Sequence, residues 1–267
     1  MDSTLQLPAR SSRPRRTGLT MMIDSGLAMG QFRDVVETWH PYLDVVKFGW
    51  STALVTPRIE DKFAILREFG VDYFFGGTLF EKYLAQNRLT DFRRLCASAR
   101  CRYVEVSNGT LPMSNTEKSS YVRKLAGEFT VLSEIGYKQA DRDALLRPRD
   151  WVRWAHEDLD AGAHMVITET RESGTTGLAR SDGTLKLEVL EALLDSGLAA
   201  RDLFFEAPNK QLQSSLISRV GPDVNLGNVA PSDLAALETL RVGLRSDTLL
   251  CFEPETAWNT GRLRATA

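Results

Sequence analysis

Short apolar runs alternate with longer amphipathic segments along most of the chain. The runs are rich in Val, Ile, Leu and Phe, which is typical of buried strands. Between them, apolar residues recur at helical spacing. We therefore predict eight strands, at residues 19–23, 43–49, 71–77, 102–107, 130–136, 164–170, 203–208 and 224–228.

The segments between these runs carry signals for helix starts and ends. Residues 147–162 are amphipathic, and Pro148 suits a first helical turn while Gly162 suits the helix end. Residues 231–245 follow the last strand, with Ser232 or Asp233 as the expected N-cap. Eight strand–helix units predict an α/β fold of the (β/α)8 TIM barrel class. A doubly wound open sheet is the alternative, and the regularity of the eight units makes it less favourable.

The domain organisation follows from length and composition. No Gly/Ser-rich linker divides the 267 residues, of which 43% are hydrophobic, so we expect one domain with a sizeable core. We assign residues 17–250 to the barrel. We predict that residues 1–16 form a disordered basic tail and residues 251–267 a C-terminal tail, which is either disordered or packed on a neighbouring subunit of a homo-oligomer.

The charge balance excludes several classes of function. The chain has 33 basic and 35 acidic residues and a formal net charge of −2, which argues against a nucleic-acid partner or a membrane surface. Three cysteines without a CxxC spacing indicate no disulfide framework and fit a reducing cytoplasm. No apolar stretch is long enough to span a membrane.

Charged residues stand at the ends of several predicted strands. In a barrel, the carboxyl ends of the strands and the loops after them form the active site. Four glutamates at matching positions on neighbouring strands would repel one another, and a divalent cation or protonation would relieve this. Carboxylate oxygens suit Mg²⁺. Ion pairs to Arg171 or Arg241 would neutralise the cluster without a metal. The charged strand ends are Asp24, Lys47, Glu105, Glu134, Glu169 and Glu206.

Seven short motifs occur in an order that resembles the phosphosulfolactate synthase family of coenzyme M biosynthesis, over about residues 19–248. They are KFGWSTA, GGTLFE, EVSNGT, SEIGYK, TRESG, FEAPNKQLQ and ETLRVGLRSDT. The resemblance implies a (β/α)8 barrel, dependence on Mg²⁺, and a carbon–sulfur lyase or synthase that adds sulfite to phosphoenolpyruvate. Plant heat-stress proteins also resemble this family without an evident sulfonate pathway.

The implied chemistry assigns roles to residues at the barrel mouth. Sulfite attacks C3 of the enolpyruvyl group, Mg²⁺ stabilises the charge that develops on the carboxylate, and a lysine protonates C2. On this basis Glu105, Glu134, Glu169 and Glu206 hold the metal. The catalytic candidates are Lys47, Lys138, Glu134 and Tyr137. The candidates for binding a small anionic substrate are Asp24, Ser25, Asn108, Arg171 and Asn228.

The chain also departs from the family pattern. Ser25 and Tyr137 stand where the family usually has lysines, Asn108 replaces a carboxylate, and the RESGTTG loop lacks a lysine near Thr175. Fewer cations predict weaker binding of phosphate and sulfite. Two alternatives to the family reaction therefore remain. One is a repurposed enzyme for a less anionic substrate in specialised metabolism, and the other is a non-catalytic stress or scaffold barrel.

Overall fold

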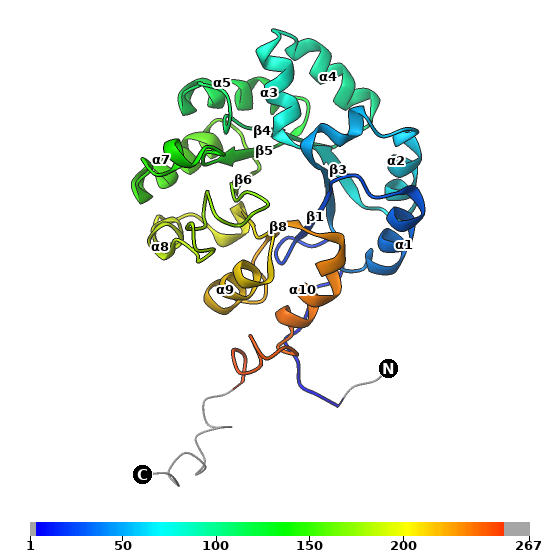
Figure 1. Cartoon of the computed structure of the whole chain (residues 1–267), viewed down its shortest axis with the longest axis vertical. Helices are drawn as coiled ribbons and strands as arrows, with labels where there is room; N and C mark the ends of the chain where they lie inside the picture. The colour runs from blue at the N-terminus through cyan, green and yellow to red at the C-terminus, as the bar shows by residue number, and fades with distance from the viewer. Residues whose placement is uncertain (1–3, 254–267) are drawn as a thin grey trace.

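A computed structural model describes residues 4–253 of the chain. Eight parallel strands form a barrel that is surrounded by helices (Figure 1). The strand order is β3-β2-β1-β8-β7-β6-β5-β4, and β3 lies against β4, so the sheet nearly closes on itself. The predicted (β/α)8 TIM barrel is confirmed, and the open sheet is wrong.

Each predicted apolar run coincides with one strand, with ends that differ by at most two residues. The strands are short because a barrel of this kind needs only a few residues of each strand to enclose its interior. They are β1 (Thr20–Asp24), β2 (Val45–Phe48), β3 (Asp72–Phe75), β4 (Tyr103–Val106), β5 (Thr130–Ile135), β6 (Met165–Thr168), β7 (Leu203–Glu206) and β8 (Leu226–Val229).

The helices bury their apolar faces on the outside of the barrel. They are α1 (Met29–Trp39), α2 (Ile59–Glu68), α3 (Gly77–Ala85), α4 (Leu89–Ser98), α5 (Asn115–Leu125), α6 (Ala140–Asp143), α7 (Pro148–Asp160), α8 (Leu187–Asp195), α9 (Lys210–Val220) and α10 (Leu234–Arg241), with 3₁₀ turns η1 (Gly49–Leu54), η2 (Ala200–Asp202) and η3 (Pro231–Asp233). None of the helices within residues 4–253 combines the length and the apolar character needed to cross a membrane.

The predicted helix boundaries agree with the structure, apart from one capping contact. Pro148 is the first residue of α7, and Gly162 follows the helix with a φ of +105°. Asp233 occupies the N-cap position of α10, but its side chain makes no capping hydrogen bond. The first turn of α10 is instead preceded by η3, which begins at Pro231.

The barrel interior is a column of apolar side chains under a polar layer. The apolar side chains are Met21, Val45, Phe74, Leu132, Met165, Ile167 and Phe204, with Leu19 and Tyr103 partly buried beside them. Side chains two residues apart on a strand point to the same face. The residues two positions after Val45, Tyr103, Leu132, Ile167 and Phe204 are Lys47, Glu105, Glu134, Glu169 and Glu206. The pleat of the strands therefore raises these charged groups directly above the apolar column.

Residues 4–16 form no helix or strand, and three of their arginines contact the barrel. Arg10 Nε lies 2.7 Å from Glu238 Oε1, and Arg15 Nη1 lies 3.1 Å from Asp44 Oδ1. Arg13 donates to the carbonyl of His40 at 2.9 Å. The domain boundaries at residues 16/17 and 250/251 stay predictions, and residues 254–267 of the predicted C-terminal tail lie outside the described residues.

Candidate active site at the barrel mouth

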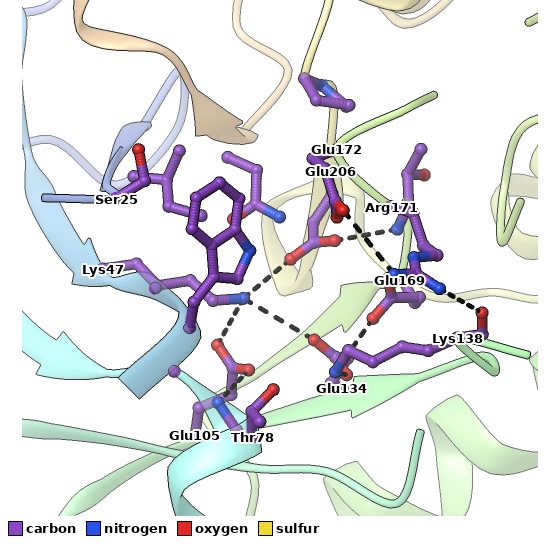
Figure 2. A pocket seen from close by; sticks show the side chains of 18 of the residues that line it. Ser25, Lys47, Thr78, Glu105, Glu134, Lys138, Glu169, Arg171, Glu172 and Glu206 are labelled. Carbon is purple, nitrogen blue, oxygen red and sulfur yellow. Dashed lines mark hydrogen bonds and ion pairs between the residues drawn. The ribbon is translucent and has the colours of Figure 1, made fainter. Parts of the chain in front are cut away.

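A cavity of about 240 Å³ opens at the carboxyl ends of the strands. It is lined by residues from the ends of β1, β2 and β4 to β8, from the loops after them, and from the turn that joins β3 to α3 (Figure 2). Three cationic side chains (Lys47, Lys138 and Arg171) and five carboxylates (Glu105, Glu134, Glu169, Glu172 and Glu206) line it, which leaves a formal charge of −2. Its size is below the range of about 300–1,000 Å³ that is usual for drug-sized ligands. The cavity suits a small substrate together with a cation.

Lys47 points into this cavity and does not face the helix layer. Its Nζ lies 2.9 Å from Glu105 Oε2, 2.9 Å from Glu206 Oε1 and 3.7 Å from Glu134 Oε2. Burial alone would lower the pKa of the lysine, but the three carboxylates outweigh it and hold the pKa above its ordinary value. Lys47 can therefore occupy an otherwise apolar strand because its ammonium group lies in the polar layer, where carboxylates surround it.

Lys138 reaches the same carboxylates from the loop after β5. Its Nζ lies 2.8 Å from Glu134 Oε1 and 3.3 Å from Glu169 Oε2, and its side chain is 23% exposed. Burial opposes the charged form, yet these two carboxylates hold the pKa of Lys138 well above its ordinary value. Both lysines are charged at neutral pH, and Lys138 is the more accessible.

The two arginines considered as partners of the glutamate cluster do not neutralise it. Arg171 lies at the cavity edge, with Nη2 3.6 Å from its neighbour Glu172. Arg241 is buried away from the mouth and donates to the carbonyls of Pro222 and Val224 at 2.6 and 2.7 Å. The ion-pair alternative named the wrong partners: the two lysines pair with these glutamates, and two ammonium groups do not neutralise four carboxylates.

Glu105, like Glu206, contacts Lys47 and accepts a hydrogen bond from a backbone N–H group, but it lies outside the group that the other three glutamates form. Its Oε1 accepts a hydrogen bond of 2.6 Å from the backbone N–H of Gly77, the first residue of α3. Burial raises the pKa of Glu105, Lys47 opposes the rise, and the balance is a pKa of about 7. The GGT turn at residues 76–78 thus directs one of its N–H groups to a carboxylate of the protein, and Glu105 is held away from the remaining glutamates.

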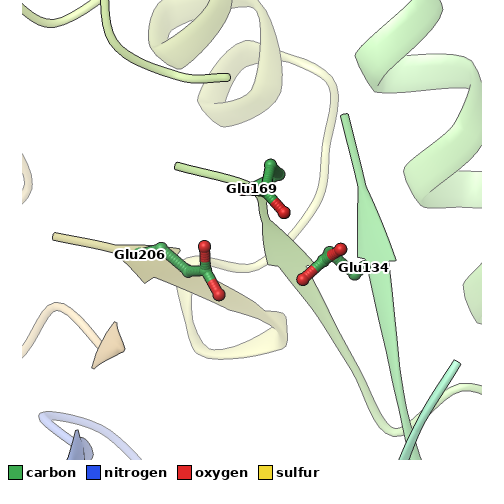
Figure 3. A group of neighbouring side chains, drawn as sticks. All are labelled: Glu134, Glu169 and Glu206. Carbon is green, nitrogen blue, oxygen red and sulfur yellow. The ribbon is translucent and has the colours of Figure 1, made fainter. Parts of the chain in front are cut away.

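Glu134, Glu169 and Glu206 form a group that could hold a metal ion (Figure 3). One carboxylate oxygen from each lies within 4.8 Å of the other two. Glu134 Oε2 and Glu169 Oε2 are buried without a hydrogen-bond partner, and the ammonium groups of Lys47 and Lys138 lie 3.7 Å and 3.3 Å from them, respectively. Burial raises the pKa of Glu169 and of Glu206, whereas Lys138 and Lys47 overcome burial and lower the pKa of Glu134. An oxygen-only donor set fits Mg²⁺ or Mn²⁺.

Three of the predicted substrate-binding residues line the cavity. Ser25, Arg171 and Asn228 all contribute to its wall. Asn228 has a φ of +53°, and its Oδ1 is buried without a hydrogen-bond partner. A left-handed residue with a free acceptor at a cavity wall is a candidate ligand contact.

Two other substrate-binding candidates have structural partners and do not line the cavity. Asp24 is 1% exposed, and its Oδ1 accepts hydrogen bonds from the backbone N–H groups of Gly26 and Leu27. Asn108 donates from Nδ2 to the carbonyl of Met113 at 2.9 Å. Both side chains shape loops at the mouth, and the structure does not bring them to the cavity wall.

Tyr137 also lies outside the cavity. Its ring packs edge-on against Trp154 at a centroid distance of 5.5 Å, and the Arg142 guanidinium lies 3.8 Å from its ring centroid. It borders a separate surface depression between α5 and α7. A catalytic role for Tyr137 therefore has no support from its position. Of the positions where this chain departs from the family pattern, Ser25 lies in the cavity wall and Asn108, Tyr137 and Thr175 do not.

Trp50 is a cavity residue that the sequence pattern did not single out. It is 57% exposed, and both it and Ser51 adopt left-handed backbone conformations, with φ values of 51° and 57°. A Cβ at the preceding Gly49 would lie 2.6 Å from Ile23 Cδ1, so a larger residue there would have to displace the Ile23 side chain. The sequence signal for Trp50 is an apolar residue directly after the glycine at the end of a strand. This pattern does not show whether the turn faces the cavity.

The comparisons with known proteins agree with the motifs. A family model described as (2R)-phospho-3-sulfolactate synthase matches residues 8–247. A phosphosulfolactate synthase from Bacillus subtilis is 46% identical over 92% of this chain and 98% of its own length. One from Methanothermobacter thermautotrophicus is 40% identical over 91% of this chain and 95% of its own length.

Solved structures similar to this one are distant in sequence. The 3-hexulose-6-phosphate synthase from Salmonella typhimurium has a TM-score of 0.54 and 15% identity, covering 85% of this chain and all of that one. The YdjI aldolase from Escherichia coli has a TM-score of 0.54 and 11% identity, covering 83% and 78%. At such identities the similarity establishes the barrel fold alone.

Proposed function

The chain belongs to the phosphosulfolactate synthase family of enzymes, and from this membership we propose that it adds sulfite to phosphoenolpyruvate with the help of Mg²⁺. The observation that carries the proposal is the meeting of three carboxylates and two lysine ammonium groups in one small cavity. Lys47 and Lys138 both lie within 4 Å of Glu134, a member of the carboxylate group.

The charge of the cavity supports the requirement for a divalent cation. With all five carboxylates ionised, the cavity carries a formal charge of −2 and repels phosphoenolpyruvate and sulfite, which are both anions. Glu134, Glu169 and Glu206 are the residues that would hold Mg²⁺, which brings the cavity to neutrality. The bound ion supplies charge stabilisation for the substrate carboxylate as electron density moves onto it.

The bonds made and broken in the proposed addition determine which tasks the side chains must perform. The sulfur lone pair of sulfite forms a bond to C3, the C2–C3 π electrons move towards the carboxylate, and a proton is then added at C2. The product keeps its phosphate ester, so no leaving group is needed. The protein therefore has to bind three anionic groups, stabilise the charge on the carboxylate and deliver one proton.

Lys138 is the better placed of the two lysines to deliver that proton. It is the partly exposed one, and it approaches from a loop at the cavity rim, whereas Lys47 is held by carboxylates from three strands. When the carboxylates are shared with a cation, the pKa of Lys138 falls back towards its ordinary value, which makes its ammonium a better acid. Lys47 remains paired with Glu105 and Glu206 and offsets part of their negative charge.

Arg171, Ser25 and Asn228 are the residues that we assign to substrate binding. Arg171 is 46% exposed at the edge of the cavity, where its guanidinium can pair with a phosphate or sulfonate group. Ser25 offers a hydroxyl, and Asn228 offers an unpaired amide oxygen that accepts from a protonated oxygen of the substrate.

Phosphorus NMR tests the proposal directly. Purified protein is incubated with phosphoenolpyruvate, sulfite and Mg²⁺, and the expected result is conversion of the enol phosphate signal into that of a saturated phosphate ester without release of phosphate. The Lys138→Met variant should lose about 10²–10⁴-fold in rate, the usual contribution of general acid catalysis. Absence of turnover by the wild-type protein with either Mg²⁺ or Mn²⁺ would overturn the proposed reaction.

A less anionic acceptor is the second candidate, and it has one observation in its favour. Ser25 lies in the cavity wall at a position where the family pattern has a lysine. In the NMR assay, Ser25→Lys should then raise turnover of phosphoenolpyruvate well above the wild-type rate. An efficient wild-type enzyme that Ser25→Lys does not improve contradicts this second candidate.

A further inference from the structure

A fully buried ion pair lies behind the strand that carries Glu134. Lys118 of α5 and Asp158 of α7 are both 0% exposed, and Lys118 Nζ lies 2.7 Å from Asp158 Oδ2. Neither residue lines the cavity. Burying two charges carries a large desolvation cost, and well-packed apolar residues are often at least as stabilising as such a pair. Stability alone therefore does not account for this pair.

Both members of the pair contact β5 just where the strand enters the cavity. Lys118 Nζ donates a hydrogen bond of 2.6 Å to the carbonyl oxygen of Glu134. Asp158 Oδ2 accepts a hydrogen bond of 2.8 Å from Ser133 Oγ, and its Oδ1 accepts one of 2.7 Å from Ser119 Oγ. The pair thus connects two outer helices to two consecutive residues of the strand.

The carbonyl oxygen of Glu134 lies past the end of the hydrogen-bond ladder between β4 and β5. The β4–β5 ladder ends with the pair Val106↔Ser133, one residue earlier. On the other side, the carbonyl of Ile135 accepts from the N–H of Glu169, so carbonyls of odd-numbered residues face β6. Successive carbonyls of a strand point to opposite sides. The carbonyl of Glu134 therefore faces the β4 side after the ladder has ended, and Lys118 is the donor that holds it.

Glu134 takes part in contacts with both lysines of the cavity and with the other two carboxylates. Its carboxylate contacts Lys138 at 2.8 Å and Lys47 at 3.7 Å, and it belongs to the group of three carboxylates. A displacement of its backbone would disturb all of these contacts together. We propose that Lys118 and Asp158 are positioning residues, which hold the end of β5 so that the Glu134 carboxylate reaches both lysines and the other two carboxylates.

The chain offers a matched control for this proposal. Lys62 and Asp24 form a second buried ion pair, 0% and 1% exposed and separated by 2.5 Å. Asp24 holds the loop after β1, and this pair contacts none of the three carboxylates. Removing Lys62 tests the cost of an unpaired buried carboxylate without loosening β5.

The first experiment separates stability from metal affinity. We expect Lys118→Met and Lys62→Met both to lower the urea midpoint, because each leaves a buried aspartate unpaired. The double variant Lys118→Met/Asp158→Asn has no unpaired charge, and its amide oxygen can accept from one of the two serines while its NH₂ group donates to the hydroxyl of the other, so its midpoint should recover. Calorimetry with Mn²⁺ should nevertheless show affinity about 10–100-fold below wild type in both Lys118 variants, as is typical when a group supporting a ligand is removed. Lys62→Met should keep the wild-type affinity.

A purely structural role for the pair predicts a different pattern, in which Mn²⁺ affinity returns with stability in the double variant. Equal losses of affinity in Lys118→Met and Lys62→Met would likewise contradict a positioning role.

The second experiment does not depend on a metal or on the proposed function. In metal-free crystals of the double variant, the Glu134 carboxylate should move by more than about 0.5 Å, the tolerance of a preorganised site, and lose its contact with Lys138. In Lys62→Met it should stay in place. A wild-type protein that fails to bind Mn²⁺ would refute the metal site while this comparison still decides the positioning role. An unmoved Glu134 in the double variant overturns the inference.

Discussion

Lys47 is a buried ammonium that balances carboxylates from neighbouring strands. Lys47→Met leaves Glu105 without its closest cation, so the already raised pKa of this carboxyl rises further. A carboxyl with a raised folded-state pKa stabilises the protein at low pH and loses that contribution as pH increases. We expect a loss of about 3–5 kcal/mol at pH 8, as for other broken buried pairs, and a much smaller loss at pH 5.5. Urea unfolding at the two pH values measures both.

Lys210 provides the control, because its contact with Asp247 lies on the surface. Lys210→Met should show no measurable change at either pH. A destabilisation of Lys47→Met that is the same at both pH values would contradict the assigned role of Glu105.

Ser51 is the second residue of a strained turn beside the cavity. A non-glycine residue at positive φ costs on the order of 1 kcal/mol or more. Ser51, with a φ of 57°, makes no side-chain hydrogen bond that would compensate this cost within the described structure. Ser51→Gly should therefore raise the unfolding free energy by about 1 kcal/mol, whereas Ala97→Gly in the exposed part of α4 should lower it by a similar amount. Thermal unfolding of the two variants distinguishes them, and equal effects would exclude strain at Ser51.

At the level of elements, three adjacent strands carry the carboxylates that we propose as metal ligands. The ends of β5, β6 and β7 carry Glu134, Glu169 and Glu206, and each strand is paired with the next. Glu134→Gln and Glu169→Gln should each weaken Mn²⁺ binding about 10–100-fold, which corresponds to about 1.5–3 kcal/mol for a contact to a charged group. Calorimetry on the purified variants gives the affinities.

Glu105→Gln is the matched control on β4. Glu105 lies outside the group of three carboxylates whose oxygens come within 4.8 Å of one another, so the variant should keep Mn²⁺ affinity close to wild type. A loss as large as that of Glu134→Gln would restore Glu105 to the metal ligands, as the sequence had suggested.

For the whole molecule, we expect the carboxylate cluster to couple stability to pH and to the proposed metal ion. Burial raises the pKa of Glu105 to about 7, so between pH 4.5 and 7 the folded chain holds a proton that the unfolded chain has released. Stability without metal should fall over this range as pH rises. A cation must displace protons from Glu169 and Glu206, whose pKa values are also raised, so metal affinity should rise with pH.

Thermal unfolding with and without Mg²⁺ at pH 5.5 and pH 8 tests this coupling. A ligand at 100 times its Kd adds about 2.7 kcal/mol, which corresponds to a Tm increase of roughly 5–10 °C for a domain of this size. We expect that increase at pH 8 and a much smaller one at pH 5.5. A larger effect of Mg²⁺ at the lower pH would contradict the assigned carboxylates.

Much of the fold and part of the site could be predicted from the sequence. The eight strands, the ends of α7 and the glutamates at the strand ends follow from local patterns, since burial and period-two alternation depend on neighbouring residues. The sequence predicted the positions of these glutamates better than it predicted their roles. Glu105 occupies the same place on its strand as the other three glutamates, yet it lies outside the group of three carboxylates whose oxygens come within 4.8 Å of one another, and its role as a metal ligand stays a prediction.

The two residues after β5 show what the sequence alone could not decide. Tyr137 and Lys138 are adjacent, and both were candidates, but Gly136 adopts a φ of +110° at a point where a Cβ would lie 2.7 Å from Trp151. The turn that results directs Lys138 to the carboxylates and packs Tyr137 on Trp154. The direction of a loop depends on long-range packing, which no pattern of adjacent residues records.

The sequence by itself determined that this chain is a (β/α)8 barrel with a layer of charges above an apolar interior, because strand periodicity places Lys47 and the glutamates on the inner face. Only the tertiary structure decided how those charges are paired. It assigned Lys47 to Glu105 and Glu206, joined Glu134 with Glu169 and Glu206, and placed Lys118 behind β5. Such pairings depend on distances of a few ångströms between residues far apart in the chain, and these distances exist only after the barrel has closed.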